Sequence, residues 1–545
     1  MKKFQKVIAV AASMMLLCGA FAGCNVADDG KDDSKNVEEV QKYDWAGKGY
    51  TKLTIDAGGQ NASYNSTKNL IYDKYSNPYP YNELERLVEE WNKANADSYA
   101  YYFEVADSSI NNDRETMLPM LQNKNAPEII YYLPTTIAED MDKGFFYDLS
   151  SVMETPNKYS KEGEAGSVAW KDLYSAEDYA GFFAPNGHMY TVTMEKNPIG
   201  LLYNKTLFNA AGITETPDTY KEFMEAQDKL NAYAVSVGRG DPNQDDTYIT
   251  PYFMMYPWYD SFLESTLLSS SMTKLDVIKK DGMVDAEEFV RGYMLKDAND
   301  NRLYNPNSDV YVELYRLIKQ MCKYYPTKWS SYYNSQQFVA GNVGMLEVTG
   351  GDIRELIDQV DGDFEVGVMP YPVLETQPAG EAASPYYTTY EIAGNVRRGL
   401  SGYCTSWAIS NSAMAKDDKN NNDKCVNACI DVLMYLSCYE NNDMMVNKRG
   451  FAIPLSGNTS YEHFRTLAEV YATDCANETT VAWGAATAGS SMNKDYYDAV
   501  YLFRTKALNG ADVASELKNL ESSFTSAANN LYTQNKWDKP SWPTA

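Results

Sequence analysis

The sequence predicts an α/β fold built as two lobes, each with a central, mostly parallel sheet flanked by helices. Two observations carry this prediction. Short apolar segments of strand length alternate along the chain with longer amphipathic segments of helical period. The chain also has 545 residues, which is long enough for two substantial hydrophobic cores.

The first alternating run begins near residue 53. Leu53 to Ala57 has the composition of a strand and leads into the turn-forming pair Gly58-Gly59. Tyr101 to Val105 has the composition of the next strand. Between the two strands, apolar residues recur at helical spacing with acidic residues among them: Tyr81, Leu84, Leu87, Val88 and Trp91.

A further helix and strand follow directly. Arg114 to Gln122 has a helical pattern, and Pro127 to Tyr132 resembles a short buried strand. Strand-helix-strand units of this length join parallel strands through a crossover helix. We therefore expect parallel pairing in this part of the chain.

A second run lies near residue 200. Gly200 to Lys205 is predicted to be a strand, and Leu207 to Gly212 a short helix that ends in glycine. Thr216 is expected to start a longer helix, since threonine caps well, Pro217 suits the first helical position and Asp218 suits the positive end of the dipole. The apolar stripe of this helix would be Tyr220, Phe223, Met224 and Leu230.

The N-terminus carries the features of an export signal. Met1 to Lys6 contains three lysines and no acid, and Val7 to Gly23 is almost wholly apolar or small. Small residues before Cys24 resemble the lipobox of bacterial lipoproteins, although Phe21 replaces the usual leucine. Residues 25–42 are polar and charged, as a tether would be. We expect lipidation at Cys24, with an ordinary secretory signal as the alternative.

Charge restricts the partners. The formal charge is −27, and loss of Lys2, Lys3 and Lys6 with the signal lowers it to −30. Such a surface repels nucleic acid and anionic membrane. We expect a monomer that touches the membrane only through its lipid anchor.

The cysteines do not suggest a disulfide framework, because their spacing is irregular and the chain is large. The chain has only two histidines, His188 and His463, so we do not expect a zinc site. We expect the cysteines to be buried free thiols. The cysteines beyond the signal are Cys322, Cys404, Cys425, Cys429, Cys438 and Cys475.

The segment "GLLYNKTLFNAAGITETPDTYKEFMEAQDKL" resembles one shared by family 1 extracellular solute-binding proteins. Other segments resemble the family in order along the chain: "PEIIYYLPTTIAEDMDKGFFYDLSSVM", "PNGHMYTVTMEKNPIG", "FVAGNVGMLEVTGGD", "FEVGVMPYP", "SGYCTSWAISNSA" and "NKRGFAIPL". The order covers most of residues 50–510, and residues 231–335 fit less well. The resemblance implies a signal peptide at 1–23, a tether at 24–48, a first lobe at 49–185 and 385–440, and a second lobe at 186–384 and 441–545.

The resemblance implies a periplasmic-binding-protein-like fold of class II, with the two lobes joined by a multi-strand hinge and the ligand held in the cleft. The resemblance also implies that the protein is a binding protein and not an enzyme. It would lie on the outer face of the bacterial cell membrane, anchored at Cys24. That protein would deliver a carbohydrate, an oligosaccharide, to the permease subunits of an ABC importer. A separate chain would hydrolyse ATP, because this one has no G-x-x-x-x-G-K-[ST] loop.

Candidate ligand contacts follow the predicted strands, since open parallel sheets bind ligands beyond the carboxyl ends of their strands. Asn61 follows the first strand, and Tyr131 and Tyr132 end another. Aromatic rings match the C–H faces of sugars, and Asn, Asp and Tyr match the hydroxyls. By resemblance, Tyr132 and Tyr496 lie near positions where the family has stacking tryptophans.

The sequence departs from the family near Thr349. The family has a tryptophan in this segment, whereas this chain has Val348-Thr349-Gly350-Gly351. Replacement rings or hydroxyl contacts in loop-like contexts are Trp258, Tyr259, Asp260, Trp407 and Trp483. Packing is the alternative role for each ring. We expect Tyr132 and Trp258 to be cleft rings that stack on sugar, rather than core residues.

One loop has the oxygen pattern of a calcium site, although no cofactor is required by the predicted function. Asp241, Asn243 and Asp245 alternate as calcium ligands do. The usual glycine is replaced by Asp246, and Tyr252 stands where a bidentate Glu would be. A structural calcium and a solvated polar turn both fit this loop.

Two other functions remain compatible with the sequence. A surface glycoside hydrolase would also be exported and needs only two carboxylates. A glycan-binding lipoprotein that serves a different uptake system is the second. No G-x-S-x-G, H-E-x-x-H or C-x-x-C motif is present.

Overall fold

The computed structural model describes residues 43–59, 64, 66, 82–107, 114–132, 137, 140–180, 182–184, 186–244, 247–255, 258–280, 284, 286–304, 309–331, 334–392, 401–420, 422–447, 452–459, 461–474, 502, 505, 506 and 508–544. The chain divides into two compact units. Unit 1 comprises Met1–Tyr131 and Ile409–Leu436, and unit 2 comprises Tyr132–Ala408 and Ser437–Ala545. The chain therefore passes from one unit to the other after Tyr131, Ala408 and Leu436.

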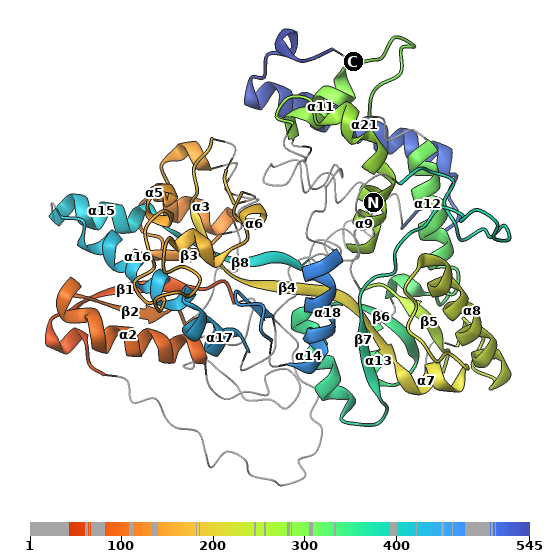
Figure 1. Ribbon diagram of the computed structural model, residues 1–545, viewed down its shortest axis with the longest axis horizontal. Helices are drawn as coiled ribbons and strands as arrows, with labels where there is room; N and C mark the ends of the chain where they lie inside the picture. The colour runs from red at the N-terminus through yellow and green to blue at the C-terminus, as the bar shows by residue number, and fades with distance from the viewer. Residues whose placement is uncertain are drawn as a thin grey trace, which may run out of the picture. The chain divides into compact units, whose positions relative to one another are not determined.

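Unit 1 contains the parallel sheet that the sequence predicts. β1 (Thr51–Asp56) pairs in parallel with β2 (Tyr101–Val105) on one side and with β3 (Ile129–Tyr131) on the other. Figure 1 shows α2 lying along this sheet. Among the described residues, the helical elements of the unit are η2 (Ala46–Lys48), α2 (Glu83–Tyr99), α3 (Arg114–Gln122), α15 (Asn411–Asn420) and α16 (Lys424–Ser437).

Helix α2 shows how the sequence produces these elements. The Asn82 side chain accepts a hydrogen bond from the backbone N–H of Glu85 and so caps the helix. Asn92 secures the helix to β2, since its amide group bonds both the N–H and the C=O of Phe103. Each fully buried leucine contributes about 1.5–3 kcal/mol. The buried apolar face is Leu84, Leu87, Val88 and Trp91, as the spacing predicts.

Unit 2 is organised around one long strand, β4 (Thr191–Asn204). The first part of β4 pairs antiparallel with β8 (Ser401–Ile409), and the second with β6 (Val343–Thr349) and β7 (Val366–Met369). β5 (Thr250–Phe253) pairs in parallel with β6. The sheet of unit 2 is therefore mixed, and the expectation of a mostly parallel sheet holds only for unit 1.

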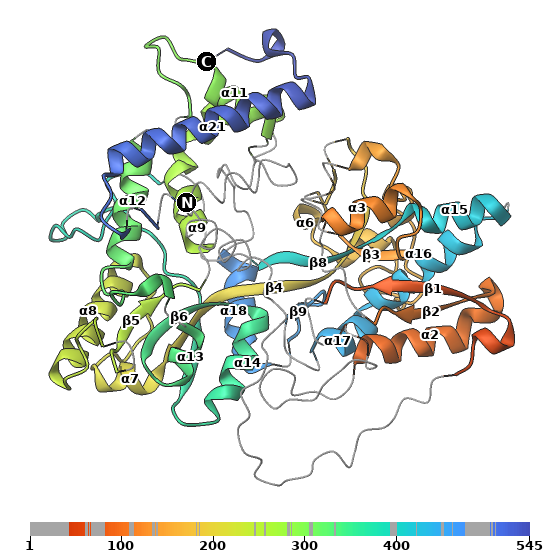
Figure 2. The same ribbon diagram turned by 180° about the vertical axis from the view of Figure 1, so that it is seen from behind.

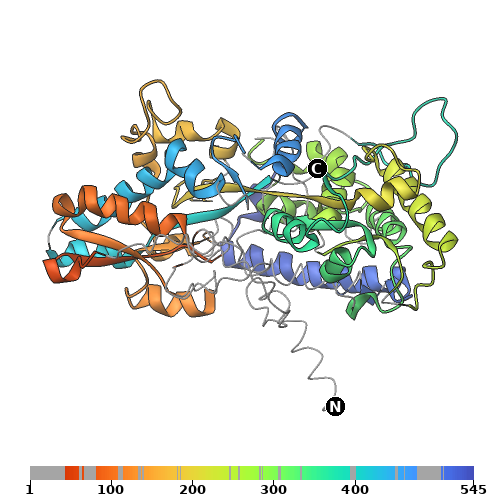
Figure 3. The ribbon, with the colours of Figure 1, turned by 90° about the horizontal axis from the view of Figure 1, so that it is seen from below.

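Helices cover this sheet and extend unit 2 beyond it. Figure 2 shows α21 beside α11, and α21 is seen lengthwise, in dark blue, in Figure 3. The remaining elements of unit 2 are η5 (Met141–Lys143), α5 (Ser150–Met153), η6 (Trp170–Leu173), α6 (Ala176–Ala180), α7 (Lys205–Ala210), α8 (Tyr220–Ser236), α9 (Trp258–Leu268), η7 (Ser269–Ser271), α10 (Met272–Leu275), α11 (Ala286–Met294), α12 (Asp309–Met321), η8 (Trp329–Ser331), α13 (Asn334–Val339), α14 (Gly350–Val360), α17 (Tyr439–Asn447), β9 (Ile453–Pro454), α18 (Glu462–Asp474), α21 (Val513–Asn535) and η9 (Lys539–Ser541).

Helix α8 begins later than the sequence analysis expects. Its N-cap is Thr219, not Thr216, and the Thr219 hydroxyl accepts from the N–H of Glu222. The Glu222 carboxylate accepts in return from the N–H of Thr219. This reciprocal capping box satisfies two backbone donors, which explains why it decides the start of the helix.

The sheet of unit 2 separates two hydrophobic clusters. Met345 of β6 lies in the cluster with Tyr220, Tyr259 and Tyr371, whereas Leu346, its neighbour along the strand, lies in the other cluster. This alternation is the period of a strand that is buried on both faces. A helix long and apolar enough for a bilayer is not found in the described part of the chain.

The described cysteines are consistent with the sequence analysis. Cys425 and Cys429 of α16 are buried free thiols, as expected. Burial raises the pKa of the Cys429 thiol well above its ordinary value. Cys322 and Cys438 are also buried.

Candidate functional site

The carboxyl edge of the unit 1 sheet gathers polar and aromatic groups. β1 ends at Asp56, β2 is followed by Asp107, and β3 ends at Tyr131. Because the three strands are parallel, their carboxyl ends meet at one edge. The hydroxyl of Ser66 donates to the Asp107 carboxylate over 3.3 Å. This edge is where an open parallel sheet binds ligands.

Gly58 fixes how closely the Tyr131 ring approaches this edge. A Cβ atom on Gly58 would lie 2.3 Å from Cγ of Tyr131, so only glycine fits beneath the ring. The backbone there has a φ of +87°, which also favours glycine. The Gly58 N–H donates to the Asp56 carboxylate over 3.1 Å and tightens the turn. The turn therefore presents backbone to the ring.

Unit 2 has a corresponding edge where its parallel strands end. β5 and β6 are in register at Phe253 and Leu346. β5 leads toward α9, which begins at Trp258, and β6 leads directly into α14, which begins at Gly350. Two helix N-termini therefore follow the carboxyl ends of adjacent strands.

The start of α14 is satisfied by side chains of unit 2 itself. Asp352 accepts from the N–H of Thr349 at 3.2 Å and from its hydroxyl at 2.6 Å. Asn197 of β4 accepts from the N–H of Gly350 at 2.8 Å. Burial raises the pKa of the Asp352 carboxyl, although the bonds from Thr349 oppose this effect. The Thr349 hydroxyl is thus committed to a neighbour, and its contact with a ligand stays a prediction.

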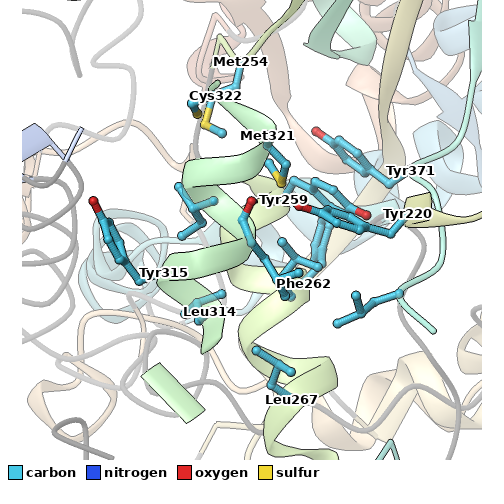
Figure 4. Close-up of a cluster of buried hydrophobic side chains, with 14 of the residues drawn as sticks. Tyr220, Met254, Tyr259, Phe262, Leu267, Leu314, Tyr315, Met321, Cys322 and Tyr371 are labelled. Atoms are coloured by element: carbon cyan, nitrogen blue, oxygen red, sulfur yellow. Dashed lines mark hydrogen bonds between the residues drawn. The ribbon is translucent and has the colours of Figure 1, made fainter. Parts of the chain in front are cut away.

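The first turn of α9 is held by contacts on its backbone and on one ring. The N–H of Tyr259 lies 3.4 Å from the Glu347 carboxylate of β6. The Tyr259 hydroxyl donates to the carbonyl of Pro372 over 2.6 Å, and its ring stacks on Tyr371 with centroids 4.6 Å apart. Figure 4 shows Tyr259 and Tyr371 within the apolar cluster. Asp260 is also buried.

Two further predicted ligand contacts, Tyr132 and Trp407, lie in the interior of unit 2. The Tyr132 side chain is 1% exposed, and its hydroxyl donates to Asp140. The expectation that Tyr132 is not a core residue is therefore wrong, because its ring packs against Phe146. Trp407 is buried within β8 opposite Val192, not in a loop. Their contact with a ligand is not tested by this geometry.

Other predicted positions are placed in part or not at all. Trp258 is the first residue of α9 rather than part of a loop. The other five predicted positions lie outside the described residues: Cys24, Asn61, Asp245, Trp483 and Tyr496.

The proposed calcium loop is hydrogen-bonded internally at the residues that are described. The Asp241 carboxylate accepts from the N–H of Asn243 at 3.0 Å and from its amide group at 2.9 Å. The amide oxygen of Asn243 accepts from the Thr327 hydroxyl at 2.9 Å. No group of three His, Cys, Asp or Glu side chains placed to hold a metal is found in the described ranges. Calcium at this loop stays a prediction.

Glu347 is the residue of this site that sequence analysis missed. Its side chain is fully buried, on the same face of β6 as Met345. Its negative charge adds to the effect of burial, which raises the pKa of the Tyr252 hydroxyl on neighbouring β5. A signal was present, since one acid interrupts the apolar run Val343–Val348.

The chain thus has two compact α/β units, each with an edge at which parallel strands end. A family model for bacterial extracellular solute-binding proteins matches residues 86–417, and the chain belongs to that family. Curated proteins yield no sequence match to the chain.

Solved structures resemble the fold over most of their length. A family 1 extracellular solute-binding protein from Bifidobacterium longum subsp. infantis has 17% identity and a TM-score of 0.51, with 88% of this chain and 100% of that chain covered. MalX from Streptococcus pneumoniae, in complex with maltopentaose, has 14% identity and a TM-score of 0.52, covering 88% and 100%. An ABC substrate-binding protein from Listeria monocytogenes, in complex with cycloalternan, has 15% identity and a TM-score of 0.51, covering 90% and 100%. At these identities the likeness establishes the two-lobed fold.

Proposed function

We propose that this protein captures an oligosaccharide outside the cell and delivers it to an ABC importer. The observation that carries the proposal is membership of the extracellular solute-binding family over residues 86–417. The proposal is supported by the relatives solved with maltopentaose and cycloalternan, which share the fold across their whole length. A permease with a separate ATPase chain is the proposed partner.

The chemistry of the two strand edges supports a polyhydroxylated ligand. At the edge of the unit 1 sheet, the Asp107 carboxylate already accepts a hydrogen bond from the Ser66 hydroxyl, which is the kind of bond that a sugar hydroxyl makes. At the edge of the unit 2 sheet, Asn197 carries an amide group, which can also bond a hydroxyl. Tyr131 lies at the unit 1 edge, where an aromatic face can cover the apolar face of a sugar ring. Such sites combine aromatic walls with a few placed polar groups.

The proposed location is the outer face of the cell membrane, with a lipid anchor at Cys24. The motive is the apolar segment that ends in small residues before this cysteine, followed by a polar tether. A monomer is proposed, with no membrane contact other than the anchor. A structural calcium at Asp241, Asn243 and Asp245 is proposed as an optional ion.

A thermal-shift screen against mono- and oligosaccharides, followed by calorimetric titration, tests the proposed function. A ligand at about 100 times its Kd should stabilise the native state by about 2.7 kcal/mol. Binding without turnover of the sugar supports a binding protein, and hydrolysis of the sugar would instead support the glycosidase alternative. A panel in which no sugar shifts the melting curve would contradict the proposal.

The same screen can examine the ion. Calcium should raise the melting temperature and a chelator should lower it, because the ion offsets repulsion between carboxylates. Equal melting temperatures under both conditions would leave only the polar turn.

A further inference from the structure

Glu347 is an acid in a place where an acid costs stability. Its side chain is fully buried on the face of β6 that carries Met345 and meets the large apolar cluster. A buried carboxylate is destabilising unless nearby donors compensate for its lost hydration. The hydroxyl of neighbouring Tyr252 is also buried and has no hydrogen-bond partner among the described residues. Apolar packing alone does not account for this choice of residue.

The contact that Glu347 makes indicates its role. Its carboxylate lies 3.4 Å from the N–H of Tyr259, the second residue of α9. The first N–H groups of a helix have no partner within the helix, and a negative charge there is favourable to the helix dipole. Glu347 therefore joins the carboxyl end of β6 to the first turn of α9.

The same turn has a second anchor that does not involve Glu347. The Tyr259 ring is parallel to that of Tyr371 within 5°, and its hydroxyl bonds the carbonyl of Pro372. One anchor holds the ring and the other holds the backbone. Together they fix the direction of the first turn, and so the backbone position of Trp258 immediately before it.

We propose that Glu347 is a positioning residue for ligand recognition: it holds the first turn of α9 and thereby places Trp258 for contact with the bound sugar. The ligand-binding part rests on the proposed function. The backbone part rests only on the contact between Glu347 and Tyr259.

The experiment compares Glu347→Leu with Glu347→Gln, which keeps the shape and an acceptor oxygen. Glu264→Leu is the matched control. Glu264 is a buried acid within α9, but its carboxylate accepts a hydrogen bond from the Tyr311 hydroxyl, away from the first turn of the helix. Hydrogen exchange of the first-turn amides of α9, calorimetric titration with the best oligosaccharide of the screen, and melting curves are measured for each variant.

We expect Glu347→Leu to speed exchange of the first-turn amides and to weaken affinity by about tenfold, the size of one lost stacking contact. Its melting temperature should change little, because removal of a buried charge offsets the cost of leaving the Tyr259 N–H without its acceptor. Glu347→Gln should retain most of the affinity, and Glu264→Leu should change neither readout. In a Trp258→Ala background, Glu347→Leu should have little further effect on affinity.

Several results would overturn the proposal. Unchanged exchange and unchanged affinity in Glu347→Leu would remove both of its parts, and additive losses with Trp258→Ala would show that Glu347 does not act through that residue. If leucine prevents folding, the same readouts are taken on Glu347→Ala. If the wild-type protein binds no sugar, the proposed function fails by itself, and the exchange data still decide whether Glu347 holds α9.

Discussion

A methyl group added at Gly58 is expected to displace the Tyr131 ring, and a second glycine provides the control. Gly49 and Gly58 stand on either side of β1 and have φ values of +91° and +87°. A Cβ atom on Gly49 would meet nothing within 4 Å, whereas one on Gly58 would lie 2.3 Å from Cγ of Tyr131. The two substitutions to alanine therefore share the backbone strain and differ in the ring contact.

The magnitudes can be separated on this basis. Alanine in the left-handed region costs about 1–2 kcal/mol, and this cost applies to Gly49→Ala and Gly58→Ala alike. Forcing extra volume against a packed side chain costs about 1–3 kcal/mol more, and this applies to Gly58→Ala alone. The free energy of unfolding should therefore fall by about 2–5 kcal/mol in Gly58→Ala.

Denaturant unfolding of both variants measures the difference, and Tyr131→Ala completes a double-mutant cycle. In the Tyr131→Ala background, the extra cost of Gly58→Ala over Gly49→Ala should shrink but not vanish. The ring is then gone, but Cβ of residue 131 still lies 2.6 Å from the added methyl group. Equal losses for Gly49→Ala and Gly58→Ala with Tyr131 present would refute the reasoning. If Tyr131 also contacts the ligand, Gly58→Ala should weaken affinity more than Gly49→Ala.

Three further outcomes are expected. Burial raises the pKa of Asp228, but hydrogen bonds from Lys323 and two tyrosines outweigh burial and leave the pKa below its ordinary value. Asp228→Asn should therefore destabilise the protein at pH 7. In melting curves, the difference from wild type should shrink as the pH falls below about 4. Tyr132→Ala should lower the free energy of unfolding by about 3–5 kcal/mol, as for other buried aromatic rings, and a tenfold loss of affinity per folded molecule in titration would add ligand contact to this packing role. Cys24→Ala should release the protein into the medium or leave it unprocessed, and normal membrane fractionation of that variant would contradict the anchor.

Local elements of the fold were predictable because their signals are local. β2 at Tyr101–Val105 and α3 at Arg114–Gln122 have the bounds that the sequence indicates. The start of α8 was missed by three residues, although the Thr219 and Glu222 pair that fixes it is a sequence pattern too. Thr216-Pro217, three residues earlier, has the composition of a helix start as well.

The long strand β4 was only partly predictable. Sequence analysis places a strand at Gly200–Lys205, whereas β4 already begins at Thr191. Its first part contains Pro198, which is unusual inside a sheet, and it is stabilised by pairing with β8, about 200 residues later in the chain. The same distant pairing puts Trp407 in a strand, although its local sequence resembles a loop.

Glu347 shows where prediction of the site stops. A single acid in the apolar run Val343–Val348 marks a position at which burial and composition disagree. Its partner, the N–H of Tyr259, is 88 residues away and belongs to the backbone, so no residue type in the sequence identifies it. Any helix N-terminus attracts an acid, because the attraction comes from its backbone and not from its side chains. The partner of Glu347 therefore depends on which helix begins near the end of β6. The sequence therefore indicates which residue is unusual, and the fold indicates what that residue holds.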